Sequence, residues 1–131
     1  MKSAYLLLLV FLLPRCRPEE GTMNGDFWTR HDGGGPYYLY FNDTLKGQLP
    51  VLQEAPRCGD IHLDKQTIFI LLTSGTHKIT VKDQQGNIVL SEEYAMKKSS
   101  GHFSLGVSIN SPGGNNQHVI TGDCSLEELS F

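Results

Sequence analysis

The sequence carries no surplus of positive charge. Its 131 residues include 11 Lys and Arg against 14 Asp and Glu, so the formal net charge is −3 at pH 7. A domain that binds nucleic acid ordinarily presents a clearly basic face, and a helix that lies on anionic lipid needs a polar side rich in Lys and Arg. The composition therefore predicts no nucleic-acid partner and no membrane contact through such a helix.

Helical patterning is missing as well. No stretch repeats apolar residues with the helical period of about 3.6 between capping residues. Glycine, in contrast, is frequent at 14 residues, which favours short strands joined by turns. We therefore expect an all-β fold.

Recognisable catalytic and metal-binding patterns are also lacking. None of the histidines stands in a paired zinc-ligand spacing; they are His31, His62, His77, His102 and His118. Asp26, His31 and Asp32 lie in a glycine-rich segment, which does not hold a nucleophile rigidly beside them. A small hydrolase is thus the least favoured hypothesis, and we expect no enzymatic activity, no bound metal and no cofactor.

Long hydrophobic runs are limited to residues 4–13, which follow Lys2 and precede a polar break. One positive charge, a short apolar core and then polar chain are the layout of a secretory signal. The run is shorter than the roughly 20 apolar residues that span a bilayer comfortably. We expect residues 1–16 to be a signal peptide, and the protein to be secreted, periplasmic or on the outer surface.

The end of this signal can be interpreted in three ways. Residues 13–16 (LPRC) resemble the lipoprotein box in their Leu and Cys, and Glu19 and Glu20 resemble the acidic export signal of surface lipoproteins in gut Bacteroidetes. We favour a lipid-anchored Cys16, which would be the only membrane attachment. The alternatives are a soluble secreted chain cut near Gly21 and, less favoured, an uncleaved N-terminal anchor.

Cysteine is scarce, and only Cys58 and Cys124 remain after the signal. In an oxidising compartment these two residues could pair, and the long loop that they would close gives about 4 kcal/mol of stabilisation in the chain-entropy model. The alternative is two separate, partly buried thiols. The sequence is compatible with both the disulfide and the separate thiols.

Residues 17–59 look irregular. Residues 17–36 are polar and glycine-rich, and residues 42–59 are punctuated by turn residues such as Gly47, Pro50 and Pro56. Between them, residues 37–41 (YYLYF) are strongly β-prone. We expect a flexible arm and an irregular link that contain one aromatic strand.

Regular alternation of polar and apolar residues begins at residue 60. It predicts about seven short strands, at residues 60–64, 67–72, 77–82, 88–94, 103–109, 118–121 and 125–131. Such strands at this spacing favour an antiparallel, immunoglobulin-like β-sandwich over residues 60–131. Leu126 faces opposite to Leu129 and Phe131 in a regular strand, so we expect a bulge there. The predicted core is Ile61, Leu63, Ile68, Ile70, Ile79, Val81, Val89, Phe103, Leu105, Val107, Val119 and Phe131.

Several segments of this region resemble a known group of proteins. They are residues 79–89 (ITVKDQQGNIV), 103–105 (FSL), 112–114 (PGG) and 119–123 (VITGD). The pattern resembles the small secreted immunoglobulin-like domains of unknown function from gut Bacteroidetes, and also the C-terminal sorting domains of secreted proteins in that phylum. The resemblance implies an immunoglobulin-like sandwich without catalytic residues.

Aromatic residues gather before the regular region, and the candidate binding residues among them are Trp28, Tyr37, Tyr38 and Tyr40. Such side chains stack on sugars or anchor protein interfaces. The alternative is that they cover an open edge or end of the sandwich. We expect a binding or accessory module for protein or glycan at the cell surface. The second hypothesis is a structural stalk or packing domain that acts with a partner chain, through strand addition at an exposed edge.

Overall fold

The computed structural model describes residues 21–109 and 117–131. The predicted signal at residues 1–16 with Cys16, and the turn at residues 112–114, lie outside the described residues. The described elements are β1 (Thr22–Trp28), β2 (Tyr38–Phe41), β3 (Thr44–Gln48), α1 (Leu63–Gln66), β4 (Ile68–Thr73), β5 (Gly75–Lys82), β6 (Ile88–Ser99), β7 (His102–Ile109), β8 (Gln117–Thr121) and β9 (Cys124–Glu128).

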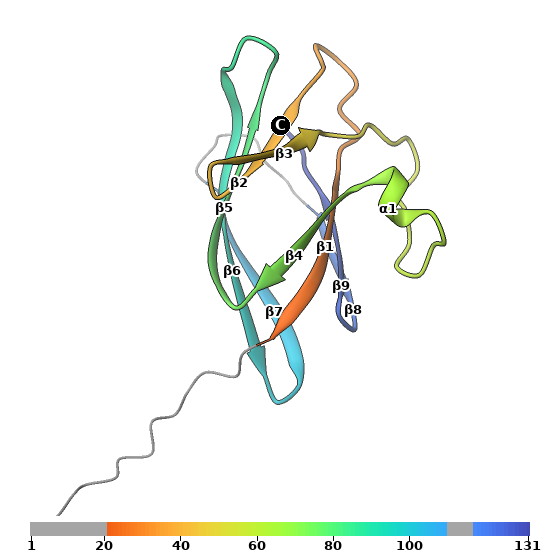
Figure 1. The fold of residues 1–131 in the computed structure, drawn as a ribbon, viewed down its shortest axis with the longest axis vertical. Helices are drawn as coiled ribbons and strands as arrows, with labels where there is room; N and C mark the ends of the chain where they lie inside the picture. Colours follow the sequence, from red (N-terminus) through yellow and green to blue (C-terminus); the bar gives the residue numbers. More distant parts are fainter. Residues whose placement is uncertain (1–20, 110–116) are drawn as a thin grey trace, which may run out of the picture.

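The strands form two sheets that pack as layers (Figure 1). One sheet has the order β4-β1-β9-β8 and the other the order β3-β2-β5-β6-β7. This confirms the predicted all-β, two-sheet architecture. The prediction of purely antiparallel pairing is wrong at one place, because β1 and β9 run parallel. These two strands lie at opposite ends of the described chain, and local patterning says nothing about the relative direction of such distant strands.

The sandwich also begins earlier than residue 60, which corrects the predicted domain boundary. β1 lies between β4 and β9, and β2 and β3 belong to the second sheet, so residues 22–48 are part of the fold. The sequence did not predict β1 as a strand because Gly25 lies within it, and glycine has a low β propensity. Its place is set by close packing, since a Cβ atom there would come within 2.9 Å of Leu72 Cδ1.

The strand predicted at residues 60–64 is absent. These residues form turns that lead into α1, with hydrogen bonds from Leu63 N to Asp60 O and from Lys65 N to His62 O. Ile61 is 90% exposed, so its assignment to the core is wrong. Five alternating residues do not distinguish a strand from a turn, and this segment lies outside the sheets with no strand beside it to pair with.

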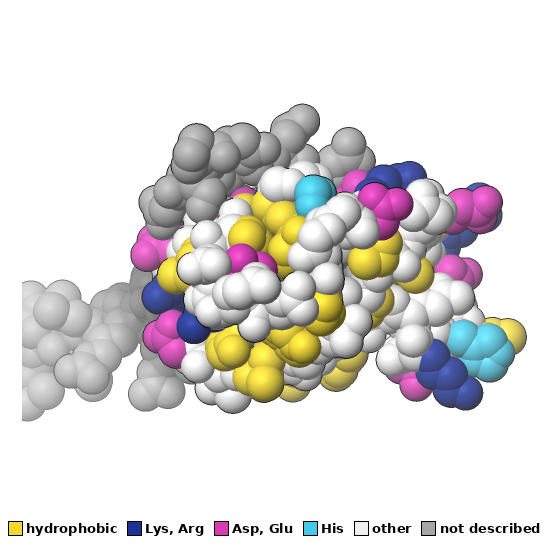
Figure 2. Space-filling view, turned by 90° about the horizontal axis from the view of Figure 1, so that it is seen from above, with side chains coloured by type: hydrophobic (Ala, Val, Ile, Leu, Met, Phe, Trp, Pro, Cys, Tyr) yellow, Lys and Arg dark blue, Asp and Glu magenta, His cyan; other side chains and the backbone are white. Residues whose placement is uncertain are grey.

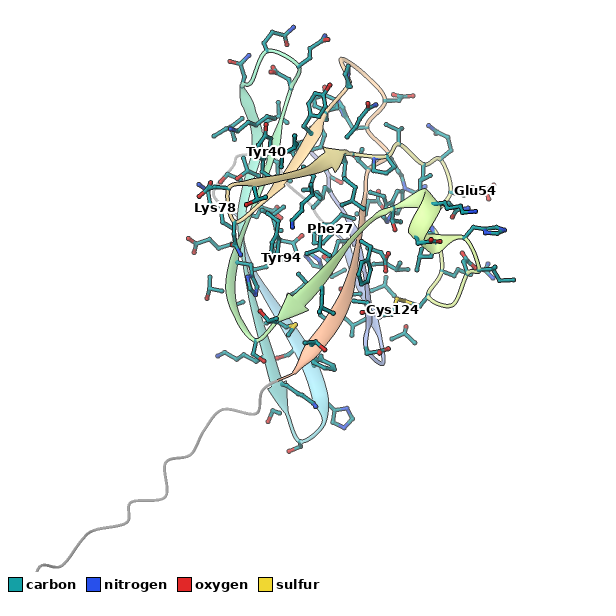
Figure 3. All side chains as sticks on the ribbon, viewed as in Figure 1. Phe27, Tyr40, Glu54, Lys78, Tyr94 and Cys124 are labelled. Atoms are coloured by element: carbon teal, nitrogen blue, oxygen red, sulfur yellow. A yellow bond between two sulfur atoms is a disulfide. The ribbon has the colours of Figure 1, made fainter. Side chains whose placement is uncertain are left out.

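The core lies between the inner faces of the two sheets. Phe27 of β1 and Tyr94 of β6 meet there, with their ring centroids 6.1 Å apart (Figure 3). Among the predicted core residues, those that are buried or pack against the core are Ile68, Ile70, Ile79, Val81, Val89, Phe103, Leu105 and Phe131. Val119 is 54% exposed and faces outward, which is a further correction. The side chain of Val107 lies outside the described part.

A group of polar side chains is buried between the sheets. Glu92 and Tyr94 enter it from β6, Ser125 and Glu127 from β9, and His118 from β8. Glu92, Tyr94 and Glu127 are each 0% exposed. His118 Nδ1 and Ser125 Oγ both hydrogen-bond to the carboxylate of Glu127, one on each oxygen. The ring of His118 meets that of Tyr94 edge-on, at a centroid distance of 5.4 Å.

This arrangement shifts the acid–base properties of its members. Burial alone lowers the pKa of His118, but the hydrogen bond and charge of Glu127, together with the charge of Glu92, outweigh it, so the pKa lies above the ordinary 6.5. For Tyr94, burial and the charges of Glu127 and Glu92 act in the same direction and raise the pKa well above 10.0. The protonated imidazole thus compensates the buried carboxylate, which would be costly if left alone.

The raised pKa of His118 predicts how stability depends on pH. A group whose pKa is higher in the folded than in the unfolded protein contributes stability that is complete below its unfolded pKa, here 6.5, and is lost as the pH rises through the folded value. Urea denaturation at a series of pH values should show this decline. His118→Gln should remove it, whereas the exposed-site control His102→Gln should keep it. An unchanged pH profile in His118→Gln would contradict the assignment.

Candidate functional site

In the buried polar group, Glu92, Tyr94 and Glu127 have no exposed surface, while the side chain of His118 is 22% exposed. Within residues 21–109 and 117–131, no set of three or more His, Cys, Asp and Glu side chains is arranged to hold a metal ion. In the same residues, no helix has the length and apolar character needed to cross a membrane. The candidate site is therefore sought at the surface.

A groove of about 310 Å³ lies on the outer face of the four-stranded sheet. The loop between β3 and α1 forms one wall, and β1, β9 and β8 form the floor and the other wall. Its lining includes Trp28, Arg30, Pro56, Arg57, Val119 and Leu126. Most of this lining is apolar, with charged groups at the rim, which is the usual composition of a binding site for an organic ligand.

Strand register places the floor residues together. Trp28 on β1 lies opposite Glu128 on β9, and Val119 on β8 lies opposite Leu126 on β9. Successive side chains of a strand point to opposite faces, so these residues share the outer face while Phe27 and its inner-face neighbours fill the core. The pairing of β9 with both neighbours is continuous, so Leu126 faces outward without the predicted bulge.

A disulfide holds the loop over the sheet. Cys58 in the loop is bonded to Cys124 at the start of β9, with the two Cα atoms 6.1 Å apart (Figure 3). Cys58 itself lines the groove. The sequence left open a disulfide or two separate thiols, and the structure contains the disulfide. The bond fixes one wall of the groove to its floor, and we call the loop residues 53–58 that it ties down the strap.

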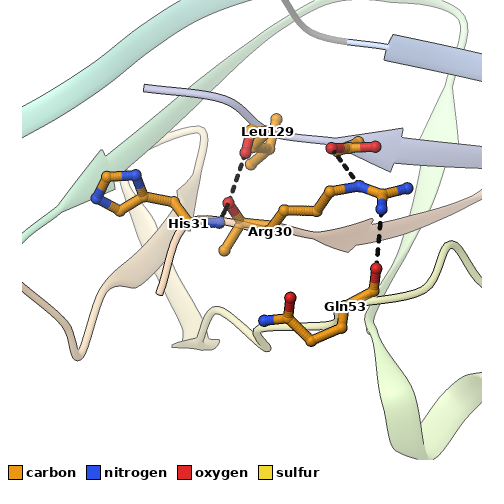
Figure 4. A network of polar contacts seen from close by, with 6 residues as sticks. Arg30, His31, Gln53 and Leu129 are labelled. Atoms are coloured by element: carbon orange, nitrogen blue, oxygen red, sulfur yellow. Dashed lines mark hydrogen bonds and ion pairs between the residues drawn. The ribbon is translucent and has the colours of Figure 1, made fainter. Parts of the chain in front are cut away.

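Arg30 ties the other end of the strap. Its Nε donates to Glu128 Oε1 at 2.9 Å and its Nη1 donates to Gln53 O at 2.8 Å (Figure 4). The guanidinium carbon lies 5.2 Å from the ring centroid of Trp28, in the cation–π range. Because Arg30 covers the indole, Trp28 is only 2% exposed although it lies on the outer face.

A third attachment lies just beyond the strap, where Thr67 meets β1. The Thr67 hydroxyl is 2.7 Å from Asp26 Oδ1 and 2.8 Å from Leu63 O. Burial raises the pKa of Asp26, the Thr67 hydrogen bond lowers it and the charge of Asp64 raises it, for a net increase. The Thr67 hydroxyl thus links the chain just before β4 to Asp26 on β1.

The four aromatic residues proposed from the sequence are not brought together. Trp28 lies in the groove. Tyr38 and Tyr40 are half-buried on β2, in the other sheet, and the Nζ of Lys82 lies 4.4 Å from the ring centroid of Tyr40 (Figure 3 labels Tyr40). The set therefore does not form one binding surface.

Tyr37 has a packing role at one end of the sandwich. It is 8% exposed, and its hydroxyl donates to Gly33 O at 2.6 Å. Its ring meets those of His31 and Phe131 at centroid distances of 5.4 and 4.8 Å. Tyr37 thus anchors the glycine-rich turn and the end of the chain.

Sequence reasoning missed most of the groove. Leu126 gave a signal, because it breaks the alternation with Leu129 and Phe131, but it predicted a bulge, and Val119 was assigned to the core. An apolar residue on the outward face of a strand can mark a second buried surface. Arg30 and Arg57 gave no signal, since an isolated Arg in a loop is ordinarily a solvated surface residue.

Comparisons with models of protein families, with curated proteins and with solved structures returned no match. The resemblance to secreted immunoglobulin-like domains therefore stays a prediction, and the function has to be argued from the site. On the face shown in Figure 2, basic and acidic side chains are interspersed around the hydrophobic ones, and neither sign forms a continuous field there.

Removing the disulfide should destabilise the fold and open the groove. Cys58→Ser/Cys124→Ser is expected to lower the free energy of unfolding by about 4 kcal/mol, because the bond closes a long loop. The emission of Trp28, the single tryptophan, should shift to longer wavelength as the strap loosens. Urea titration followed by fluorescence measures both. Arg57→Ala is the matched control and should change neither, while an unaltered midpoint in the double variant would contradict the strap's role.

Proposed function

We propose that this protein is a non-catalytic binding module, secreted or held at the cell surface, that takes an acidic peptide segment of a partner protein into the groove. The observation that carries the proposal is an apolar groove with the guanidinium of Arg57 at its rim, which has no hydrogen bond or ion pair among the described residues. The proposed secretion is based on the apolar run at residues 4–13. The proposed lipid anchor is based on Cys16.

The apolar part of the groove suits a hydrophobic side chain. Trp28, Val119, Leu126 and Pro56 surround the space, and the disulfide and Arg30 hold it open without a ligand. Fully burying a Leu- or Phe-sized side chain contributes about 1.5–3 kcal/mol. Because the walls are already tied together, little ordering cost offsets this gain.

The charge at the rim suits a carboxylate. Arg30 is engaged by Glu128 and Gln53 O, so its charge is already compensated. The guanidinium of Arg57 makes no hydrogen bond or ion pair within the described part of the chain, and only its backbone N–H is used, by Asp60 Oδ2 at 2.8 Å. Guanidinium pairs with carboxylate in a two-bond geometry that gives strength and direction.

The covered aromatic rings argue against a sugar ligand. A sugar would need an open aromatic face, whereas Arg30 covers Trp28 and Lys82 lies over Tyr40.

A peptide array tests this proposal. The protein is applied to random ten-residue peptides, and the enriched ones are titrated against it by Trp28 fluorescence. We expect binders in which Asp or Glu lies close to Leu, Ile or an aromatic residue. Arg57→Gln should weaken binding tenfold or more, because a hydrogen bond to a charged group is worth about 1.5–3 kcal/mol.

Two variants locate the binding surface. Val119→Glu places a negative charge in the groove, which repels an acidic peptide, and should abolish binding. Ile88→Glu replaces a comparably exposed apolar side chain on β6 and should leave binding intact. Enrichment of basic peptides, or binding that survives Val119→Glu, would contradict the proposal. Binding to a glycan array that depends on Tyr38 and Tyr40 would favour a sugar ligand instead.

A further inference from the structure

One edge of the four-stranded sheet is open. β4 ends the strand order β4-β1-β9-β8, so one side of it pairs with β1 and the other pairs with no strand of the described residues. Its sequence, IFILLT, contains no charged residue, proline or glycine. Figure 1 shows β1 beside β4 and the chain passing from the end of β4 into β5 of the other sheet. Such an edge is a ready template for another strand.

The corresponding edge of the other sheet is protected in the usual ways. Its edge strand β3 carries Lys46 and Gly47, and the pairing of β2 with β3 shifts register between Leu39 and Tyr40. A charged side chain, a glycine and an irregular register each hinder the addition of a strand. β4 has none of these features.

The outer face of β4 is apolar as well as unpaired. Phe69 is 51% exposed and Leu71 is 52% exposed, while Ile70 and Leu72 are buried in the core. The exposed pair lies at the opposite edge of the sheet from Val119 in the groove. Phe69 on β4 is in register with Asp26 on β1, and Val119 lies on β8, two strands beyond β1. The binding site proposed above does not use this surface.

We propose that β4 of one copy pairs antiparallel with β4 of a second copy, about a two-fold axis at Ile70. In that register Phe69 lies opposite the partner's Leu71 and Leu71 lies opposite the partner's Phe69, so four apolar side chains meet on the outer face. Directly opposite residues in an antiparallel pair share a face, so the buried side chains stay on the inner side. No charged side chain of β4 is opposed by another.

Self-complementarity identifies the occupant as a second copy. A two-fold interface brings one patch against itself, so each residue must tolerate its own symmetric partner. An uncharged strand whose exposed pair is Phe69 and Leu71 satisfies this in the register centred on Ile70. The two grooves remain open in the pair, because they lie on the β8 side of each sheet, so the dimer would present two peptide sites.

Light scattering and sedimentation equilibrium of the mature chain test the dimer. We expect a concentration-dependent dimer whose β4 amides are protected from hydrogen exchange. Leu71→Lys should give a monomer at concentrations where the wild type is dimeric, because the introduced charge faces Phe69 twice. Ile88→Lys, which removes an exposed apolar residue elsewhere, should remain dimeric. Urea midpoints confirm that each variant is folded.

A charge-pair variant tests the register itself. Phe69→Lys/Leu71→Glu should restore the dimer because opposite charges then face each other across the axis, whereas Phe69→Lys/Leu71→Lys should stay monomeric. A wild type that stays monomeric with exchangeable β4 amides would overturn the proposal. So would a monomer with protected β4 amides, which would mean that another segment of the same chain covers this edge, or a dimer unaffected by Leu71→Lys.

Discussion

The covalent tie between Cys58 and Cys124 is the constraint on which the outer face of the four-stranded sheet depends. Without it, the strap would be a surface loop that covers Trp28 only through the contacts of Arg30. With it, the strap is fixed to the first residue of β9, and a sheet face that would otherwise meet solvent becomes the wall of a groove. Arg30, which ties the other end of the strap, covers Trp28 and keeps it buried on the outside of the sandwich.

The inner and outer faces of β8 and β9 carry opposite chemistry. His118 and Glu127 face inward and form a buried, hydrogen-bonded pair, while Val119 and Leu126, the next residues along each strand, face outward into the groove. This contact joins β8 to β9 within the hairpin, and the ring of Tyr94 meets His118 from the other sheet. Separation of the two strands would leave the carboxylate of Glu127 buried without His118, so the contact favours an intact hairpin as the floor of the groove.

Part of the sheet structure could be predicted from alternation, because β5 and β7 repeat apolar residues on one face, and β4 is a short, continuous apolar run. The early strands could not, since Gly25 and Asp26 in the middle of β1 resemble loop residues. The segment at 60–64 alternates like a strand but folds as turns outside the sheets. The candidate site was mostly beyond sequence reasoning, since it joins Trp28, Arg57 and Val119, which only long-range strand pairing and the disulfide bring together.

The measurement that tests the central claim most directly is a titration of one acidic, array-selected peptide against the oxidised and the gently reduced protein, with the fold monitored by far-ultraviolet circular dichroism. If the strap builds the groove, the oxidised protein binds and the reduced protein, still folded as two sheets, loses most of its affinity. Equal affinity in both states would show that the peptide binds elsewhere, and that the groove on the outer face is not the functional site.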